Sequence, residues 1–142
     1  MTDLRLQDFR PPSSAKANAS HPVGPYYSWM VREVADALSR VKEYFPGYSG
    51  SHEIAGFVWH QGWNDACHAA GADPKQYEFD LANLIKDLRK DLNAPNMKAI
   101  VGTSGMCGFA DTDKYPKTGG YGTFWPDFHH FDCSELNVHV HV

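Results

Sequence analysis

The sequence predicts an α/β fold with a parallel sheet, because two short apolar runs flank a segment with the period of an amphipathic helix. The first run covers residues 54–59 and the second covers residues 98–103. Neither run alternates polar and apolar residues, which is typical of strands buried on both faces of a sheet. Two parallel strands joined by a helix form a βαβ unit, and its crossover should be right-handed.

Two helices are expected. The one between the strands should cover residues 74–92, with Asp73 as its N-cap and Pro74 at its first position. Its apolar residues recur at helical spacing: Tyr77, Leu81, Leu84, Ile85, Leu88 and Leu92. An earlier helix should begin near Pro25 and end at Pro46-Gly47. Its apolar face would hold Tyr27, Met30, Val31, Val34, Leu38, Val41 and Phe45.

The remaining segments divide the chain into three parts. Residues 1–25 contain four prolines and predict an extended arm without regular structure. Residues 26–108 carry the α/β pattern. Residues 109–142 are rich in glycine, aromatic residues and histidine, show no helical period, and predict an irregular His-rich tail.

Composition excludes several classes of partner. The formal net charge is -4 and no basic stripe is present, so we expect no nucleic acid partner. No apolar run is long enough to span a bilayer, so we expect no membrane partner, and no signal peptide is visible. The three cysteines match neither a zinc ribbon nor a full disulfide set, and we expect no cofactor and no metal site.

The loop after the first strand has the side chains that acyl transfer needs. Acyl transfer places negative charge on a carbonyl oxygen, which fixed N–H donors stabilise. Gly62 can bring its backbone N–H close to a substrate, and Asn64 and Gln61 have amide donors. Trp59 and Trp63 could provide a flat apolar surface for a sugar ring. The same glycine and asparagine are also common in ordinary turns, and this alternative stays open.

The segment Gly56-Phe57-Val58-Trp59-His60-Gln61-Gly62-Trp63-Asn64-Asp65 resembles the G-x-N-D block of SGNH hydrolases. More narrowly, it resembles the sialate O-acetylesterase and acetylxylan-esterase branch, where W-x-Q-G is usual. Residues 8–14, 23–27 and 102–106 are also similar to that branch. The resemblance implies a three-layer, flavodoxin-like α/β sheet, incomplete at the N-terminus and the C-terminus. It also implies a carbohydrate esterase that removes O-acetyl groups by serine-hydrolase chemistry, from a family whose members are typically secreted or periplasmic.

The resemblance also implies roles that the chain fills only in part. Many relatives have Glu after the Q-G, where this chain has Trp63, so no acid role transfers. No serine stands in a G-D-S or G-Q-S-N block, so no nucleophile is assigned, and Ser104 is an outside candidate. Asp127 and His130 fit the D-x-x-H block by spacing, with His130 as general base and Asp127 orienting it. A surface histidine cluster is the alternative for this pair.

We therefore expect an esterase acting on acetylated carbohydrates, present as an incomplete and weakly active or inactive copy. A different class of function remains open, that of a non-catalytic fragment that binds metal or carbohydrate. The tail holds plausible ligands for zinc or copper: His129, His130, Asp132, Cys133, His139 and His141. The oligomeric state does not follow from the sequence.

Overall fold

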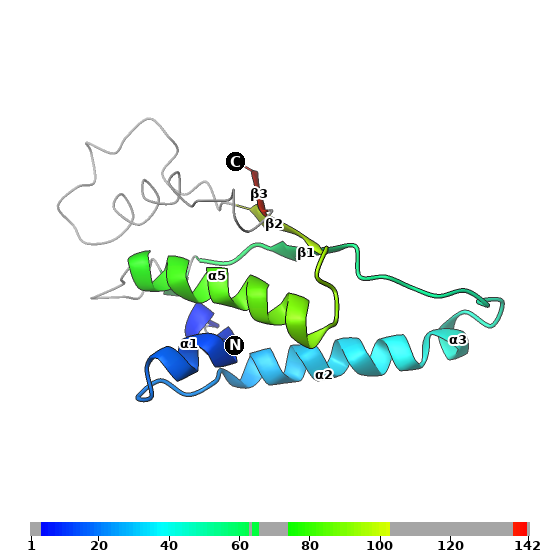
Figure 1. Ribbon diagram of the computed structural model, residues 1–142, viewed down its shortest axis with the longest axis horizontal. Coiled ribbons are helices and arrows are strands. Elements are labelled where there is room, and N and C mark those ends of the chain that lie inside the picture. Colours follow the sequence, from blue (N-terminus) through cyan, green and yellow to red (C-terminus); the bar gives the residue numbers. More distant parts are fainter. Residues whose placement is uncertain (1–3, 63, 66–73, 103–137, 142) are drawn as a thin grey trace.

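A computed structural model describes residues 4–62, 64–65, 74–102 and 138–141 of the chain. It contains helices and a small parallel sheet, arranged as shown in Figure 1. In chain order the elements are η1 (Leu6–Phe9), α1 (Pro12–Ala17), α2 (Pro25–Ser39), α3 (Val41–Tyr44), β1 (Gly56–Trp59), α5 (Pro74–Asp91), β2 (Lys98–Gly102) and β3 (Val138–His141). None of the helices in the described part of the chain has the length and hydropathy of a membrane span.

The sheet has the strand order β1-β2-β3, with both neighbouring pairs parallel. Gly56 lies opposite Lys98 and Trp59 opposite Val101, so the prediction of two adjacent parallel strands is confirmed. The third strand corrects the prediction of an irregular tail for residues 138–141, which pair with β2. Valine alternates with histidine in this short stretch, and valine favours extended backbone, but four residues are too few to stand out.

Helix α5 covers one face of the sheet. Leu81, Leu84 and Ile85 are fully buried. They share one hydrophobic cluster with Ala99 and Val101 of β2 and with Trp59 of β1, as the position of α5 beside the strands in Figure 1 also shows. The helix starts at Pro74 as predicted, whereas Asp73 lies outside the described residues.

The opposite face of β1 is open in the described structure, where Val58 is 69% exposed. The prediction that β1 is buried on both faces is therefore wrong for this residue, because the described helices pack on the other side. The described residues establish an α/β arrangement, and the complete three-layer form stays a prediction.

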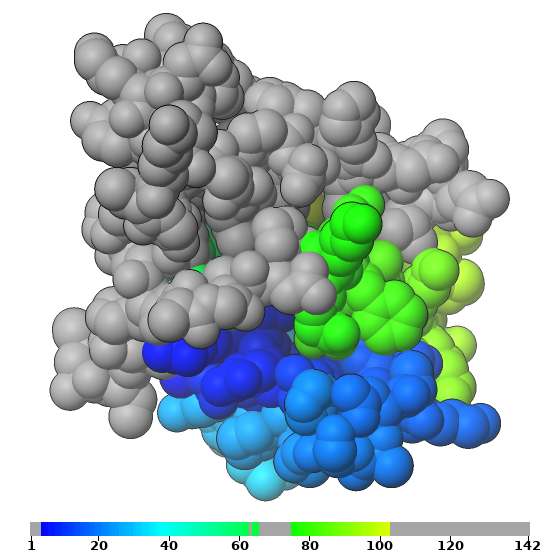
Figure 2. All heavy atoms as spheres, turned by 90° about the vertical axis from the view of Figure 1, so that its left-hand side faces the viewer, coloured from blue at the N-terminus to red at the C-terminus, as the bar shows by residue number. Residues whose placement is uncertain are grey.

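The N-terminal segment is folded, which corrects the prediction of an arm without regular structure. Residues 4–24 include η1 and α1, and they lie directly against α5, as Figure 2 shows for the blue and green spheres. Leu6 is 2% exposed and joins the main cluster, and the Gly24 N–H donates to the Arg10 carbonyl at 2.9 Å. The composition of this segment suggested a loop, but polar contacts to α5 hold it in place.

Helix α2 begins at Pro25 as predicted, but the predicted long helix is interrupted at Arg40. The short helix α3 follows it. Phe45, the last apolar position of the predicted stripe, is 65% exposed and contributes little packing. Packing of an apolar face is what stabilises most helices in proteins, and the helix breaks where that packing fades.

Candidate functional site

The loop that follows β1 lies at the carboxyl end of the sheet, where open α/β folds place their ligands. Gly62 is buried in this loop and has a backbone φ of 142°. Side chains rarely tolerate this conformation, so the position requires glycine. The loop therefore has a specific backbone shape.

Tyr77 of α5 binds this loop through its hydroxyl group. Its hydroxyl lies 2.9 Å from the Gln61 backbone oxygen and 3.0 Å from the Gln61 side-chain Oε1. The same hydroxyl oxygen accepts a hydrogen bond from Trp59 Nε1 at 3.1 Å. Burial raises the pKa of Tyr77 above its ordinary value, so the hydroxyl keeps its proton and remains a donor.

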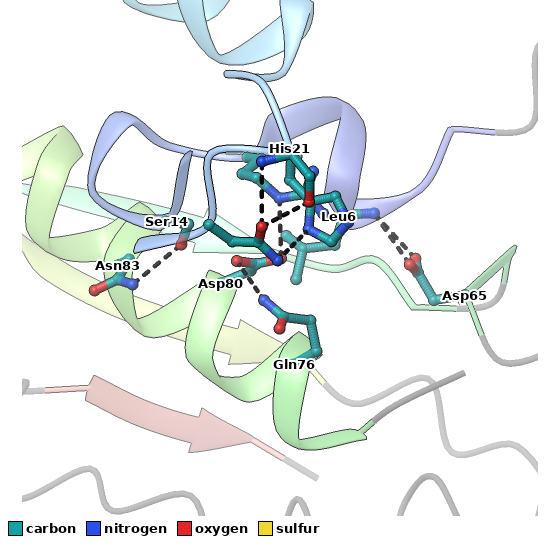
Figure 3. A network of polar contacts seen from close by, with 10 residues as sticks. Leu6, Ser14, His21, Asp65, Gln76, Asp80 and Asn83 are labelled. Carbon is teal, nitrogen blue, oxygen red and sulfur yellow. Dashed lines mark hydrogen bonds and ion pairs between the residues drawn. The ribbon is translucent and has the colours of Figure 1, made fainter. Parts of the chain in front are cut away.

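The N-terminal segment holds the loop from a second direction. The Leu4 carbonyl accepts from Asn64 Nδ2 at 2.9 Å and from Gln61 Nε2 at 3.4 Å. The Leu6 N–H donates to the Asp65 carboxylate, with its two oxygens at 3.1 and 3.2 Å (Figure 3). Gln61 Nε2 also donates to Asp65. The loop is thus tied to a segment far away in the sequence.

Asp65 is a partly buried carboxylate in this loop. Burial raises its pKa above the ordinary value, while the hydrogen bonds from Gln61 and the Leu6 N–H act in the opposite direction. Through these hydrogen bonds, the Asp65 carboxylate acts as an acceptor that fixes the turn between Gln61 and Asp65.

Two of the predicted binding residues have other partners in the structure. Trp59 is 6% exposed, and its ring packs edge-on against Phe9 at 5.2 Å and tilted against Phe57 at 5.9 Å. Both neighbours belong to the protein itself, and the role of Trp59 toward a sugar stays a prediction. Gln61 uses its side-chain amide for Leu4, Asp65 and Tyr77.

Asn64 and Gly62 retain the expected position in the loop. Asn64 is half-buried and one of its N–H groups is bound to Leu4. Their roles as oxyanion donors remain predictions. Trp63, Ser104, Asp127 and His130 lie outside the described residues, so the predicted base and the candidate nucleophile are not placed relative to the loop.

The metal alternative concerns six residues of the tail. Within the described ranges, no group of three or more His, Cys, Asp or Glu side chains is close enough to hold a metal ion. His139 and His141 belong to β3, and the remaining residues proposed as ligands, His129, His130, Asp132 and Cys133, lie outside the described residues.

Tyr77 and the Leu4–Leu6 backbone also belong to this site, and no motif in the sequence points to them. In the sequence, Tyr77 fits the apolar spacing of a helix. A signal was available, because a buried tyrosine must place its hydroxyl on a partner, and a helix that follows the loop directly brings such a partner near. The Leu4 and Leu6 contacts involve backbone atoms, which no side-chain pattern reveals.

The described residues also line a cavity of about 450 Å³ at the other end of the strands. Its walls come from Leu38 at the end of α2, from residues 52–55 before β1, and from residues 92–97 before β2 together with Lys98, its first residue. Because β1 and β2 are parallel, this cavity lies at the edge of the sheet opposite to the loop after β1.

The chain is similar to one known protein family. A family model described as carbohydrate esterase, sialic acid-specific acetylesterase, matches residues 13–118 of the chain. The chain belongs to this carbohydrate esterase family. The match includes the loop after β1, helix α5 and strand β2, and it confirms the resemblance seen in the sequence. Neither the curated proteins nor the solved structures compared with the chain gave a match.

Proposed function

We propose that the chain acts on O-acetyl esters of carbohydrates by serine-hydrolase chemistry, and that the loop of residues 60–65 binds the oxygen on which negative charge develops. The observation that carries this proposal is the shape of the loop. It places Gly62, in a conformation that only glycine adopts readily, and Asn64 directly after a strand of the sheet. Family membership supports ester hydrolysis as the class of reaction.

The proposed reaction has two steps. A serine hydroxyl attacks the acetyl carbonyl, its proton passes to a histidine, and the carbonyl oxygen becomes negative. The carbon–oxygen bond to the sugar then breaks, and the sugar oxygen takes the proton from the histidine. Water hydrolyses the acetyl-enzyme in the same manner, releasing acetate. His130 with Asp127 is the proposed base pair, and the Gly62 and Asn64 donors would stabilise the negative oxygen in both steps.

We further propose that this chain is a slow or inactive esterase. None of its serines stands in a G-D-S or G-Q-S-N block, and full activity needs an activated nucleophile beside a base. An oxyanion site with bound substrate can still accelerate the reaction roughly a thousandfold over water when the triad is absent.

The test is release of acetate from an acetylated sugar by the purified chain. We expect turnover far below about 10 per second, the median for enzymes. Residual turnover should fall by about 10²–10³ in Asn64→Ala, the loss seen when one oxyanion donor is removed. It should be unaffected in Ser104→Ala.

Four results would change the proposal. Turnover near the median that a serine-directed phosphonate blocks would contradict slow activity. If Ser104→Ala then abolished this turnover, Ser104 would be the nucleophile. Stoichiometric uptake of zinc without any turnover would instead support the metal-binding alternative, and binding of a sugar without turnover would support a carbohydrate-binding fragment.

A further inference from the structure

We infer that Tyr77 is a positioning residue that sets the direction of the Gly62 N–H and thereby prepares it to bind a carboxylate or ester oxyanion. This inference rests on the proposed function of the loop. It adds a residue from helix α5 that lies outside the recognisable family block and acts through the Gln61–Gly62 peptide.

The first step is the geometry of one peptide unit. The Gln61 carbonyl and the Gly62 N–H belong to the same peptide, and the described chain contains no cis peptide bonds. In a planar trans peptide these two groups point in opposite directions. The Tyr77 hydroxyl lies 2.9 Å from the Gln61 carbonyl oxygen, so this oxygen points toward α5. The Gly62 N–H must therefore point away from α5.

The second step is the fixed orientation of the tyrosine. Tyr77 is 4% exposed within the hydrophobic cluster, so its ring cannot move freely. Trp59 Nε1 donates to the hydroxyl oxygen at 3.1 Å, which leaves the hydroxyl proton for an acceptor. That acceptor is Gln61, through its backbone oxygen and through Oε1 at 3.0 Å. A rotated Gln61–Gly62 peptide would lose this bond.

The third step is the state of the Gly62 N–H. Gly62 is buried, and none of the hydrogen bonds between the described residues uses its N–H. An N–H held in one direction gains a strong hydrogen bond when a negative oxygen arrives. The unusual φ of 142° at Gly62 is consistent with a peptide that is held for this purpose.

The experiment uses acetate, the product of the proposed reaction, as the probe. The isotopically labelled full chain is titrated with sodium acetate at constant ionic strength, with chloride as the balancing anion. The amide signals of the Gly62 backbone and the Asn64 side chain are followed by NMR. We expect both signals to shift in the wild-type protein, and we expect Y77F to lose the Gly62 shift while keeping the Asn64 shift.

Y27F is the matched control. Tyr27 is 3% exposed and its hydroxyl donates to Asp91 at 2.7 Å, so this change also removes a buried hydroxyl and a hydrogen bond to α5. It lies away from the loop, and both acetate shifts should persist.

The outcomes separate the two proposals. If neither signal of the wild-type protein responds to acetate, the oxyanion site itself is refuted and this inference fails with it. A response of Asn64 without Gly62 overturns only the inference, and this measurement needs no variant, so it decides even if Y77F does not fold. A full Gly62 response in Y77F, or equal loss of both signals, also overturns the specific role of Tyr77.

Discussion

Both faces of helix α5 pack against other parts of the protein, but the sequence pattern predicts the packing of only one of them. Its apolar face packs on the strands through Leu81, Leu84, Ile85 and Leu88. Its polar face binds the N-terminal segment through Asp80, Asn83 and Asp87, and it binds Tyr27 of helix α2 through Asp91; these side chains are spaced three or four residues apart. The apolar and the polar side chains both recur with the helical period, but only apolar periodicity is normally taken to indicate packing.

The polar face makes directional contacts. Arg10 Nε lies 3.4 Å from Asp80 Oδ2, with both side chains largely buried. Asp87 accepts from the Ser13 N–H and from Ser13 Oγ, each at 2.7 Å. Ser13 is in the first turn of α1, whose N-cap is Pro11 and has no side-chain cap. Asp87 therefore supplies from a second helix the acceptor that this helix start needs.

The largest effect should come from breaking the buried ion pair. Asp80→Ala leaves the Arg10 guanidinium buried without its carboxylate, and removing one partner of such a pair costs about 3–5 kcal/mol. We expect a loss of this size in the free energy of unfolding, measured by urea denaturation. The double variant Arg10→Met with Asp80→Leu should recover most of the loss, because apolar replacement of a buried pair is often neutral. A small loss in Asp80→Ala would show that the polar face is solvated.

The apolar face should respond almost as strongly. Leu84 is 0% exposed, and truncation to alanine leaves a cavity between α5 and the strands. Leu→Ala changes in a core cost about 2–5 kcal/mol. Urea denaturation of Leu84→Ala should show a loss in this range, and the exposed Leu84 neighbour Lys86 changed to alanine should show almost none. A similar stability for both variants would contradict the described packing.

Much of the fold could be predicted from local patterns. The helix at Pro74, the two strands around it and their parallel pairing followed from apolar spacing, because burial on one face imposes a period. The folded N-terminal segment could not be predicted in this way. Its partners on α5 lie about seventy residues away, and proline-rich composition describes only local backbone preference.

The site was predicted to a lesser degree. Gly62 and Asn64 were located through a motif, and the structure places them after β1 as expected. Trp59 packs against Phe9 and Phe57 with 6% exposure, and the motif does not reveal these neighbours. Tyr77 was missed because its ring satisfies an apolar pattern and conceals the hydroxyl that holds the loop.

A smaller effect should follow from close packing within the N-terminal segment, where Gly24 lies against the backbone of Asp8. A Cβ added at Gly24 would lie 2.3 Å from the Asp8 carbonyl oxygen, which is backbone and cannot rotate aside. Overpacking of this kind costs about 1–3 kcal/mol, and Gly24→Ala should lose that much on urea denaturation. Gly47→Ala is the matched control, since a Cβ there meets nothing within 4 Å. Equal losses would show that residues 8–24 do not pack as described.

The smallest effect is a pH dependence of the free energy of unfolding that comes from Asp65, which joins the loop to the N-terminal segment. The pKa of Asp65 is raised by burial from the ordinary 3.8, so the folded state binds its proton more tightly than the unfolded state does. Stability from this group is then greatest below pH 3.8 and declines as the pH rises from there through the folded pKa. Asp65→Asn lacks this titration. The difference in unfolding free energy, wild type minus Asp65→Asn, should therefore decrease as pH increases over that interval, and the subtraction cancels the other carboxylates. The decrease should be modest, because the bonds from Gln61 and the Leu6 N–H oppose the effect of burial. A difference that increases with pH would mean that these two hydrogen bonds outweigh burial and that the charged carboxylate stabilises the loop.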